Sequence, residues 1–214
     1  MSELVLSARS ISLPKLTGGF RPARPAEIKR LLSQAELWFG PRSVLEGDSS
    51  FRQIIPYIVL VNDGQIVAYE RAKHGSEARL HSKLSVGLGG HIGLDDAVTS
   101  GGKLNAWRTI LAAADRELKE ELSAIDIIET RWHGFVSDDA SSVGRVHLGI
   151  IAFSVSRSRP KAKDRAVRRL RLLTLEALGK RQEELEPWSA VVLRALRPQL
   201  IAAVDRMGNR SHAS

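Results

Sequence analysis

The sequence predicts an α/β protein in which helices cover both faces of a mixed sheet. Three features indicate this class. Two apolar segments joined by Asn62-Asp63-Gly64 have the pattern of a β-hairpin, and a strongly amphipathic helix follows over residues 105–122. Further strands and a helical C-terminus come after that helix. No apolar run approaches the roughly 18 residues that a membrane-spanning helix needs.

The N-terminal part is expected to hold an arm and one short helix. Residues 1–24 end in a sequence rich in glycine and proline, which predicts an irregular N-terminal arm. From Ile28 to Trp38 the apolar residues recur at helical spacing. A helix is therefore predicted from Pro25 to Phe39, ended by Gly40-Pro41.

The middle of the chain is expected to supply the sheet. Residues 54–61 are apolar throughout, as in a central strand, and the Asp-Gly turn joins them to a second arm at residues 65–71. The other strands predicted from apolar composition lie at residues 83–88, 131–136 and 146–155.

Two helices have the clearest apolar stripes. In residues 105–122 the stripe is formed by Trp107, Ile110, Leu111, Ala114, Leu118 and Leu122. A second helix is predicted over residues 187–204, kinked or divided by Pro198. Between them, residues 171–178 suggest a short strand and a helical turn. The four tryptophans, Trp38, Trp107, Trp132 and Trp188, lie in apolar patterns and are expected in the core.

Composition limits the classes of function. The chain has 214 residues and no cysteine, which excludes disulfides, thiolate metal sites and cysteine nucleophiles. The N-terminus lacks the basic start and apolar core of a secretory signal, so a cytoplasmic protein with no membrane partner is expected. We expect one domain over residues 25–206 and a flexible tail at 207–214. The net charge of +8 favours anionic ligands such as nucleotides or phosphorylated metabolites.

Most of this charge comes from one stretch. Between Arg157 and Arg171 there are eight basic residues and one acid, Asp164, which together supply +7 of the net +8. The stretch contains no aromatic side chain on which a base could stack. We therefore expect a solvated connection that steers anions weakly, and we do not expect nucleic-acid binding.

The candidate catalytic segment is residues 116–122, Arg-Glu-Leu-Lys-Glu-Glu-Leu, near the end of the predicted helix. Glu117, Glu120 and Glu121 are spaced i, i+3 and i+4, so they project from one helical face. Like charges at this spacing destabilise a helix by roughly 0.2–0.5 kcal/mol per pair unless a cation lies among them. Clustered carboxylates suit Mg²⁺ or Mn²⁺, and the planar guanidinium of Arg116 can orient one of them.

A solvated acidic face, balanced by Arg116 and Lys119, is the simpler alternative. However, the pattern Arg-Glu-aliphatic-x-Glu-Glu arises by chance in only about one of a thousand chains of this length. The glycine-rich end of a predicted strand also lies upstream, at Gly89-Gly90. This setting favours a functional site.

The segment resembles the signature of the Nudix (MutT-like) hydrolases, G-x5-E-x7-R-E-U-x-E-E-x-G-U, in which U is aliphatic. The matching residues are Arg116, Glu117, Leu118, Glu120 and Glu121, while Ser123 and Ala124 replace the last glycine and aliphatic residue. The resemblance covers about residues 54–196. It implies an α/β/α sandwich with a mixed central sheet, and family members are often homodimers.

The first half of the signature allows two alignments. Strict spacing places its glycine at Gly102 but puts Arg108 at the glutamate position. Alternatively, Gly90 and Asp96 supply a glycine and a carboxylate, with a longer insertion before Arg116. We prefer the second alignment, and we expect residues 93–104 to form an exposed, mobile loop beside the metal site.

The resemblance also implies a reaction, the hydrolysis of a diphosphate linkage in a nucleoside diphosphate derivative or related phosphorylated metabolite. Glu117, Glu120 and Glu121 would bind Mg²⁺, with Mn²⁺ as an alternative, and the ion would lower the pKa of the attacking water. The catalytic residues would be Arg116 and the same three glutamates. Gly89, Gly90 and His91 would form a loop that binds the phosphates of the ligand.

Several points stay open at the sequence level. The general base has four candidates, Asp138, Asp139, Glu183 and Glu184. His91 and His147 each have a structural and a substrate-binding interpretation, and His74, His81 and His133 lack metal-ligand spacing. The substrate is not identified. Alternative functions are a catalytically weak Nudix-fold sensor of nucleotides and a nucleic-acid-binding module.

Overall fold

The computed structural model describes residues 3–16, 19–71, 83–164 and 167–211. His74 and His81 lie outside these residues. The contacts between Cα atoms divide the chain into two compact units. The first comprises Met1–Tyr57, Gly89–Glu117 and Trp132–Ile151, and the second comprises Ile58–Leu88, Leu118–Arg131 and Ala152–Ser214.

The described residues contain strands throughout the chain, as the predicted α/β class requires. The strands are β1 (Leu4–Arg9), β2 (Phe20–Pro22), β3 (Leu37–Pro41), β4 (Phe51–Asn62), β5 (Gln65–Arg71), β6 (Leu84–Ser85), β7 (Gly87–Leu88), β8 (Thr99–Ser100), β9 (Lys103–Leu104), β10 (Leu122–Ser123), β11 (Ile127–Val136), β12 (His147–Ser156), β13 (Lys161–Ala162) and β14 (Val167–Leu173).

The helices are fewer and mostly short. They are α1 (Pro25–Gln34), α2 (Arg42–Leu45), α3 (Ala106–Glu121), α4 (Ser142–Arg145), α5 (Leu175–Gly179), α6 (Pro187–Ala195) and α7 (Arg197–Ser211), with single 3-10 turns at Ser10–Ser12, Leu94–Asp96 and Gln182–Glu184. Among the described residues, no helix combines the length and the apolar character that crossing a membrane requires.

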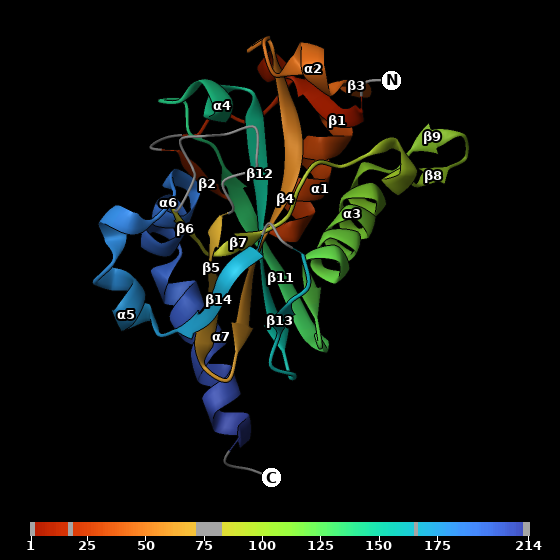
Figure 1. Ribbon diagram of the computed structural model, residues 1–214. Coiled ribbons are helices and arrows are strands. Elements are labelled where there is room, and N and C mark those ends of the chain that lie inside the picture. Colours follow the sequence, from red (N-terminus) through yellow and green to blue (C-terminus); the bar gives the residue numbers. More distant parts are fainter. Residues whose placement is uncertain (1–2, 17–18, 72–82, 165–166, 212–214) are drawn as a thin grey trace. The chain divides into compact units, whose positions relative to one another are not determined.

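The main sheet follows the order β14-β5-β4-β12-β11-β2 (Figure 1). The predicted hairpin is confirmed as β4 and β5, with Val61 opposite Ile66 and Asn62 opposite Gln65. Its two turn residues, Asp63 and Gly64, have φ angles of 45° and 71°. A two-residue turn with both φ angles positive matches the twist of the flanking strands, which explains the Asp-Gly sequence. The mixed α/β class with a central mixed sheet is therefore confirmed.

The N-terminal arm is more regular than predicted. Leu4–Arg9 forms β1, which pairs with β3 and β4 and buries Val5, Leu6 and Ala8. As a strand of the sheet, this segment buries its apolar side chains and pairs its backbone groups, and an irregular arm would do neither as fully. The predicted helix to Phe39 is also wrong, because α1 ends at Gln34 and Leu37–Pro41 forms β3. Trp38 is 41% exposed and does not belong to the core.

Helix α3 agrees with the prediction to within one residue at each end. Asn105 caps it, since its side-chain oxygen accepts a hydrogen bond from the backbone N–H of Arg108 at 3.1 Å. Within the part of α3 that belongs to the first unit, Ile110, Ala113 and Ala114 are buried. Leu111 is 39% exposed, so its place in the predicted apolar stripe is wrong.

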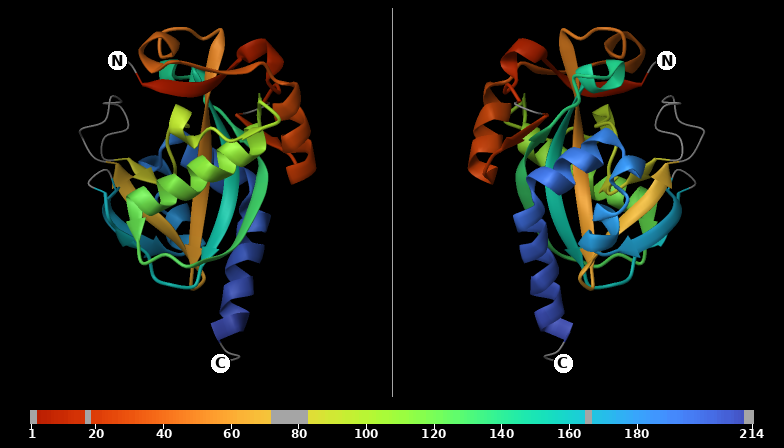
Figure 2. Two further views of the ribbon diagram at one scale, coloured as in Figure 1. Left: turned by 90° about the vertical axis from the view of Figure 1, so that its right-hand side faces the viewer. Right: turned by 90° about the vertical axis from the view of Figure 1, so that its left-hand side faces the viewer.

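The predicted strands of the middle region are confirmed, with the segment 83–88 divided into β6 and β7. The C-terminal helix is divided too, as Pro198 predicted: α6 ends at Ala195 and α7 begins at Arg197, and Figure 2 shows the chain changing direction there. α7 continues to Ser211, so residues 207–211 of the predicted flexible tail are helical. The division into an arm, one domain and a tail stays a prediction.

Two segments expected to be loops contain regular structure. Residues 93–104 form a 3-10 turn and the exposed β8–β9 hairpin, which projects near the start of α3 in Figure 1. The basic stretch includes β13 and most of β14. In both segments, hydrogen bonds between backbone groups order a polar stretch of chain. Side-chain composition does not reveal such pairing.

Asn62 joins the ends of β4 and β12 in the second unit. Its amide nitrogen donates to the carbonyl oxygens of Ser156 and Ser158, both at 3.0 Å, and the residue is 4% exposed.

Replacing Asn62 with Ala should lower the free energy of unfolding by about 1–3 kcal/mol, because buried carbonyls lose their donor. Asn62→Asp should cost more, since a carboxylate would face these oxygens. Chemical denaturation measures both effects, and an unchanged midpoint for Asn62→Ala would contradict the assignment.

Candidate functional site

The guanidinium of Arg116 is held from several sides near the end of α3. Its Nε and Nη2 atoms donate to Oδ1 and Oδ2 of Asp96, both at 2.8 Å. Nη2 also donates to the backbone carbonyl of His91 at 3.0 Å, and Nη1 lies 2.9 Å from Oε1 of Glu117. The bidentate bond to Asp96 is the main reason that the pKa of Arg116 is raised above its usual value. Arg116 thus links the loop at His91 to Asp96 and Glu117.

Asp96 is positioned by the 3-10 turn Leu94–Asp96. Its Oδ2 accepts a hydrogen bond from the backbone N–H of Gly93 at 2.9 Å, and the residue is 7% exposed. A buried carboxylate needs such partners, since a charge left unpaired in the interior is costly. The sequence placed Asp96 at a motif position but gave no sign that it binds Arg116.

The two glycines before His91 have steric roles. Gly89 has a φ angle of 143°, and a Cβ atom there would lie 1.9 Å from the carbonyl oxygen of Pro56. At Gly90 a Cβ atom would lie 2.6 Å from Oε1 of Glu117. Glu117 is 9% exposed, so this backbone packs directly against a buried carboxylate.

The three predicted metal ligands share α3 but differ in exposure. Glu117 is buried, Glu121 is half-buried and Glu120 is exposed. Across the described ranges, no group of three or more histidine or acidic side chains is gathered closely enough to hold an ion. The chemistry of the donors fits a hard divalent cation, because all three offer carboxylate oxygens. Because residue 90 is glycine, the Glu117 carboxylate occupies the space beside its backbone that a side chain at this position would fill.

His91 and His147 form a pair within the first unit. Their Nε2 atoms lie 3.1 Å apart, and Nδ1 of His147 lies 2.8 Å from the carbonyl oxygen of Val143. The carbonyl can only accept, so Nδ1 of His147 carries a hydrogen. When the His147 ring is neutral, its Nε2 atom then accepts a hydrogen bond from Nε2 of His91. Burial, followed by the charge of Arg42 and by His147, lowers the pKa of His91 to about 3.

The four candidates for the general base have different surroundings. Asp139 is ion-paired with Arg52 at 2.9 Å, and Asp138 accepts a hydrogen bond from the backbone N–H of Ala140. Glu184 is ion-paired with Arg181 at 2.6 Å, which lowers the pKa of Glu184. Glu183 is exposed. None is distinguished as a base by these contacts.

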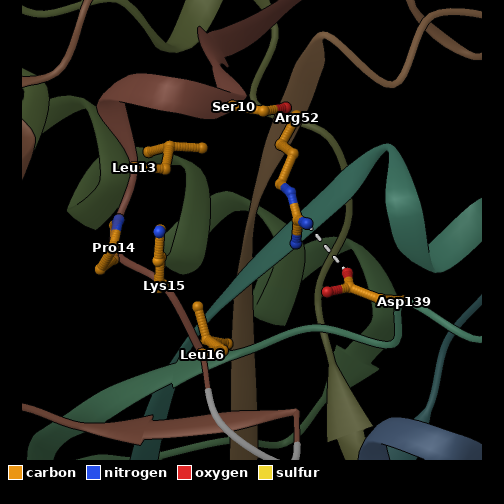
Figure 3. Close-up of a pocket in the computed structure, with 7 residues that line it drawn as sticks. All are labelled: Ser10, Leu13, Pro14, Lys15, Leu16, Arg52 and Asp139. Atoms are coloured by element: carbon orange, nitrogen blue, oxygen red, sulfur yellow. Dashed lines mark hydrogen bonds and ion pairs between the residues drawn. The ribbon is translucent and has the colours of Figure 1, made fainter.

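Asp139 and Arg52 border a pocket of about 240 Å³ in the first unit (Figure 3). The other lining residues come from the N-terminal arm and are Ser10, Leu13, Pro14, Lys15 and Leu16. The predicted phosphate-binding residues Gly89, Gly90 and His91 are not among them. The pocket therefore does not include the glycine loop.

The geometry is consistent with the alignment through Gly90 and Asp96. Gly90 touches Glu117, and Asp96 binds Arg116, so both residues meet the glutamate helix. In the competing alignment, Gly102 lies in the β8–β9 turn with no atom within 4 Å of a Cβ placed there, and Arg108 is exposed.

The structure superposes on the crystal structure of Tm1382, a candidate Nudix hydrolase, with a TM-score of 0.76 and 24% identity, covering 91% of this chain and 98% of Tm1382. The chain has the Nudix hydrolase fold. DR0079 from Deinococcus radiodurans is a more distant neighbour of this Nudix-fold protein, with 21% identity, a TM-score of 0.46 and coverage of 67% and 82%.

The chain also has a relative at the level of sequence. It is 35% identical over 131 residues to protein YmaB of Bacillus subtilis (strain 168), covering 59% of this chain and 61% of YmaB. The match thus spans about three fifths of the length of YmaB. No protein-family model matches the chain.

Stability should depend on pH through His91. In the folded state His91 has a pKa of about 3, whereas in the unfolded chain its pKa is near 6.5. Protonation below pH 6.5 therefore favours the unfolded state. The contribution of neutral His91 to the free energy of unfolding is fully present above pH 6.5 and is lost as the pH falls towards 3. From pH 7.5 to 5.5 the His91 contribution to the unfolding free energy should fall by about 1.4 kcal/mol. Urea denaturation should show that His91→Gln removes this part of the pH slope, while the control His133→Gln retains it. Identical slopes in wild type and His91→Gln would refute the assignment.

Proposed function

We propose that this chain is a divalent-metal-dependent hydrolase that cleaves a diphosphate linkage in a nucleoside diphosphate derivative or a related phosphorylated metabolite. The observation that carries the proposal is the end of α3. There the Arg116–Glu117 pair is fixed by Asp96 and by the loop at Gly90, within the sequence pattern of the Nudix signature. The Nudix fold supports the same assignment.

Each residue of this group has a distinct task in the proposed reaction. Glu117, Glu120 and Glu121 would hold Mg²⁺ or Mn²⁺, which when bound neutralises phosphate charge and lowers the pKa of water. Arg116 orients the Glu117 carboxylate through the contact at 2.9 Å. Asp96 holds Arg116 in place and is therefore a positioning residue. Water is the nucleophile, in keeping with a chain that has no cysteine.

The glycine loop is proposed to approach the phosphates of the substrate. The missing side chains at Gly89 and Gly90 let this loop pack closely against Pro56 and against the Glu117 carboxylate. The carbonyl of His91 is fixed by Arg116, which makes the loop and the glutamate helix one connected unit. This arrangement supports a preorganised binding site. The two glycines also have a steric role, because a side chain at either position would clash with Pro56 or Glu117.

Replacing Glu120 or Glu121 with Gln should lower metal-dependent turnover by about a hundredfold or more, because loss of a charged ligand weakens both metal binding and charge neutralisation. Asp115→Asn, on the same helix but off the glutamate face, is the matched control. A phosphate-release screen over nucleoside diphosphate derivatives with Mg²⁺ and Mn²⁺ measures turnover. Titration with Mn²⁺ followed by calorimetry measures binding separately. Unchanged turnover and unchanged Mn²⁺ affinity in both variants would refute the metal site, and binding without any turnover would favour a sensor.

Asp96→Asn should reduce activity by about 10- to 100-fold, as is typical when a group that orients a metal ligand is altered. The neighbouring Asp95 is exposed, so Asp95→Asn is a control with the same loss of charge. Arg116→Ala should resemble Asp96→Asn, because both release the Glu117 carboxylate from its position. The Mn²⁺ affinity of each variant should fall along with the rate constant. Equal effects of Asp95→Asn and Asp96→Asn would contradict the role of Asp96.

A further inference from the structure

The basic stretch is fixed to the end of α3 within the second unit. The backbone N–H of Lys163 donates to the carbonyl of Glu121 at 2.9 Å, and Nζ of Lys163 donates to the carbonyl of Lys119 at 2.8 Å. Next to these bonds, β13 pairs with β10 through Leu122 and Ala162. A helix C-terminus leaves carbonyls without partners, and Lys163 satisfies two of them. The stretch is thus an ordered part of the surface.

The same stretch continues into the edge of the main sheet. β14 pairs with β5 and is the terminal strand in the sheet order, beside β5 in Figure 1. Arg168, Arg169 and Arg171 are all exposed. The register shifts between Arg168 and Arg171, and Arg169 has a φ angle of 47°, as expected at a bulge.

Only part of this charge is neutralised by the protein. Arg157 pairs with Asp126, while Arg169 and Arg171 share Glu70 at 3.1 and 3.7 Å. Within the described ranges, Arg159, Lys161 and Arg168 form no ion pair, and all three are exposed. The surface formed by residues 157–163 and 167–171 therefore presents exposed cations that are available to an anionic partner.

We infer that this surface binds the phosphate backbone of a nucleic-acid strand. A repeating anion is complementary in charge to a surface that exposes several cations, of which Lys161 lies on β13 and Arg168 on β14. Contacts to phosphates supply most sequence-independent affinity. The absence of aromatic side chains argues against base stacking but not against backbone contacts, which need none. The inference goes beyond the expectation of a solvated connection that steers anions weakly. The inference does not depend on the proposed hydrolase activity, since binding is measured without turnover.

Protection of a sheet edge is the competing explanation. Arginine side chains and bulges commonly prevent edge strands from pairing with other chains. This accounts for Arg168, Arg169 and Arg171 on β14. It does not account for Arg159, which lies outside the strands, and Lys161 lies on β13, which pairs with β10 and is not part of the main sheet.

The test is fluorescence anisotropy with a labelled 20-nucleotide single-stranded DNA, in EDTA, over a series of salt concentrations. The wild-type binding constant should fall steeply with salt, with a log–log slope of about −0.7 for each phosphate contacted. The triple variant Arg159→Gln, Lys161→Gln and Arg168→Gln removes three cations without leaving an acid unpaired. If all three contact phosphates, the slope should become shallower by about 2, and binding at 0.1 M salt should weaken by up to about a hundredfold.

The matched control is Arg24→Gln, Arg30→Gln and Arg108→Gln, which removes the same charge from exposed residues of the first unit. It should retain the wild-type slope. Thermal melts should show that both triple variants remain folded. Equal loss of slope in the two variants would assign binding to net charge alone and overturn the inference. Absence of binding by the wild type at 0.05 M salt would also overturn it.

Discussion

The bidentate bond between Arg116 and Asp96 is the interaction on which the candidate site depends. It joins two segments that are 20 residues apart in the sequence, and both of its N–O distances are 2.8 Å. Once Arg116 is fixed, its remaining nitrogens reach the carbonyl of His91 and the carboxylate of Glu117. A planar guanidinium can serve three partners in this way, whereas lysine would offer only a point charge. The loop, the turn and the helix therefore share one cation.

Local patterns in the sequence predicted much of the fold. The β4–β5 hairpin and α3 were predictable because their signals, an Asp-Gly turn and a helical apolar stripe, lie within the segments themselves. β3 was missed because Leu37, Trp38 and Phe39 continue the helical spacing of α1, and only pairing with β1 makes them a strand. β1 and β13 were missed for the same reason. Pairing with a distant segment outweighs local propensity and leaves no periodic trace.

The candidate site was predictable in part. The Arg116–Glu121 pattern predicts the helix, and the predicted strand before Gly90 favours the alignment through Gly90 and Asp96 over the one with strict spacing. The pair formed by His91 and His147 was not predictable, because 56 residues separate them and neither has a partner signal nearby. Likewise, nothing in the sequence shows that the N–H and ammonium groups of Lys163 cap α3. Contacts of this kind arise from the tertiary fold, so a single sequence shows the residue types and not their partners.

The direction of the hydrogen bonds through the two histidines has a consequence for how this chain can vary. Nδ1 of His147 donates to Val143, so in the neutral ring the Nε2 atom accepts from His91. For two neutral rings, this sets the order of donors and acceptors from the glycine loop to the start of β12. An apolar residue at either position would remove the partner that Nε2 of the other histidine has at 3.1 Å. Natural variants of this chain should accordingly exchange the two positions together, as a covarying pair.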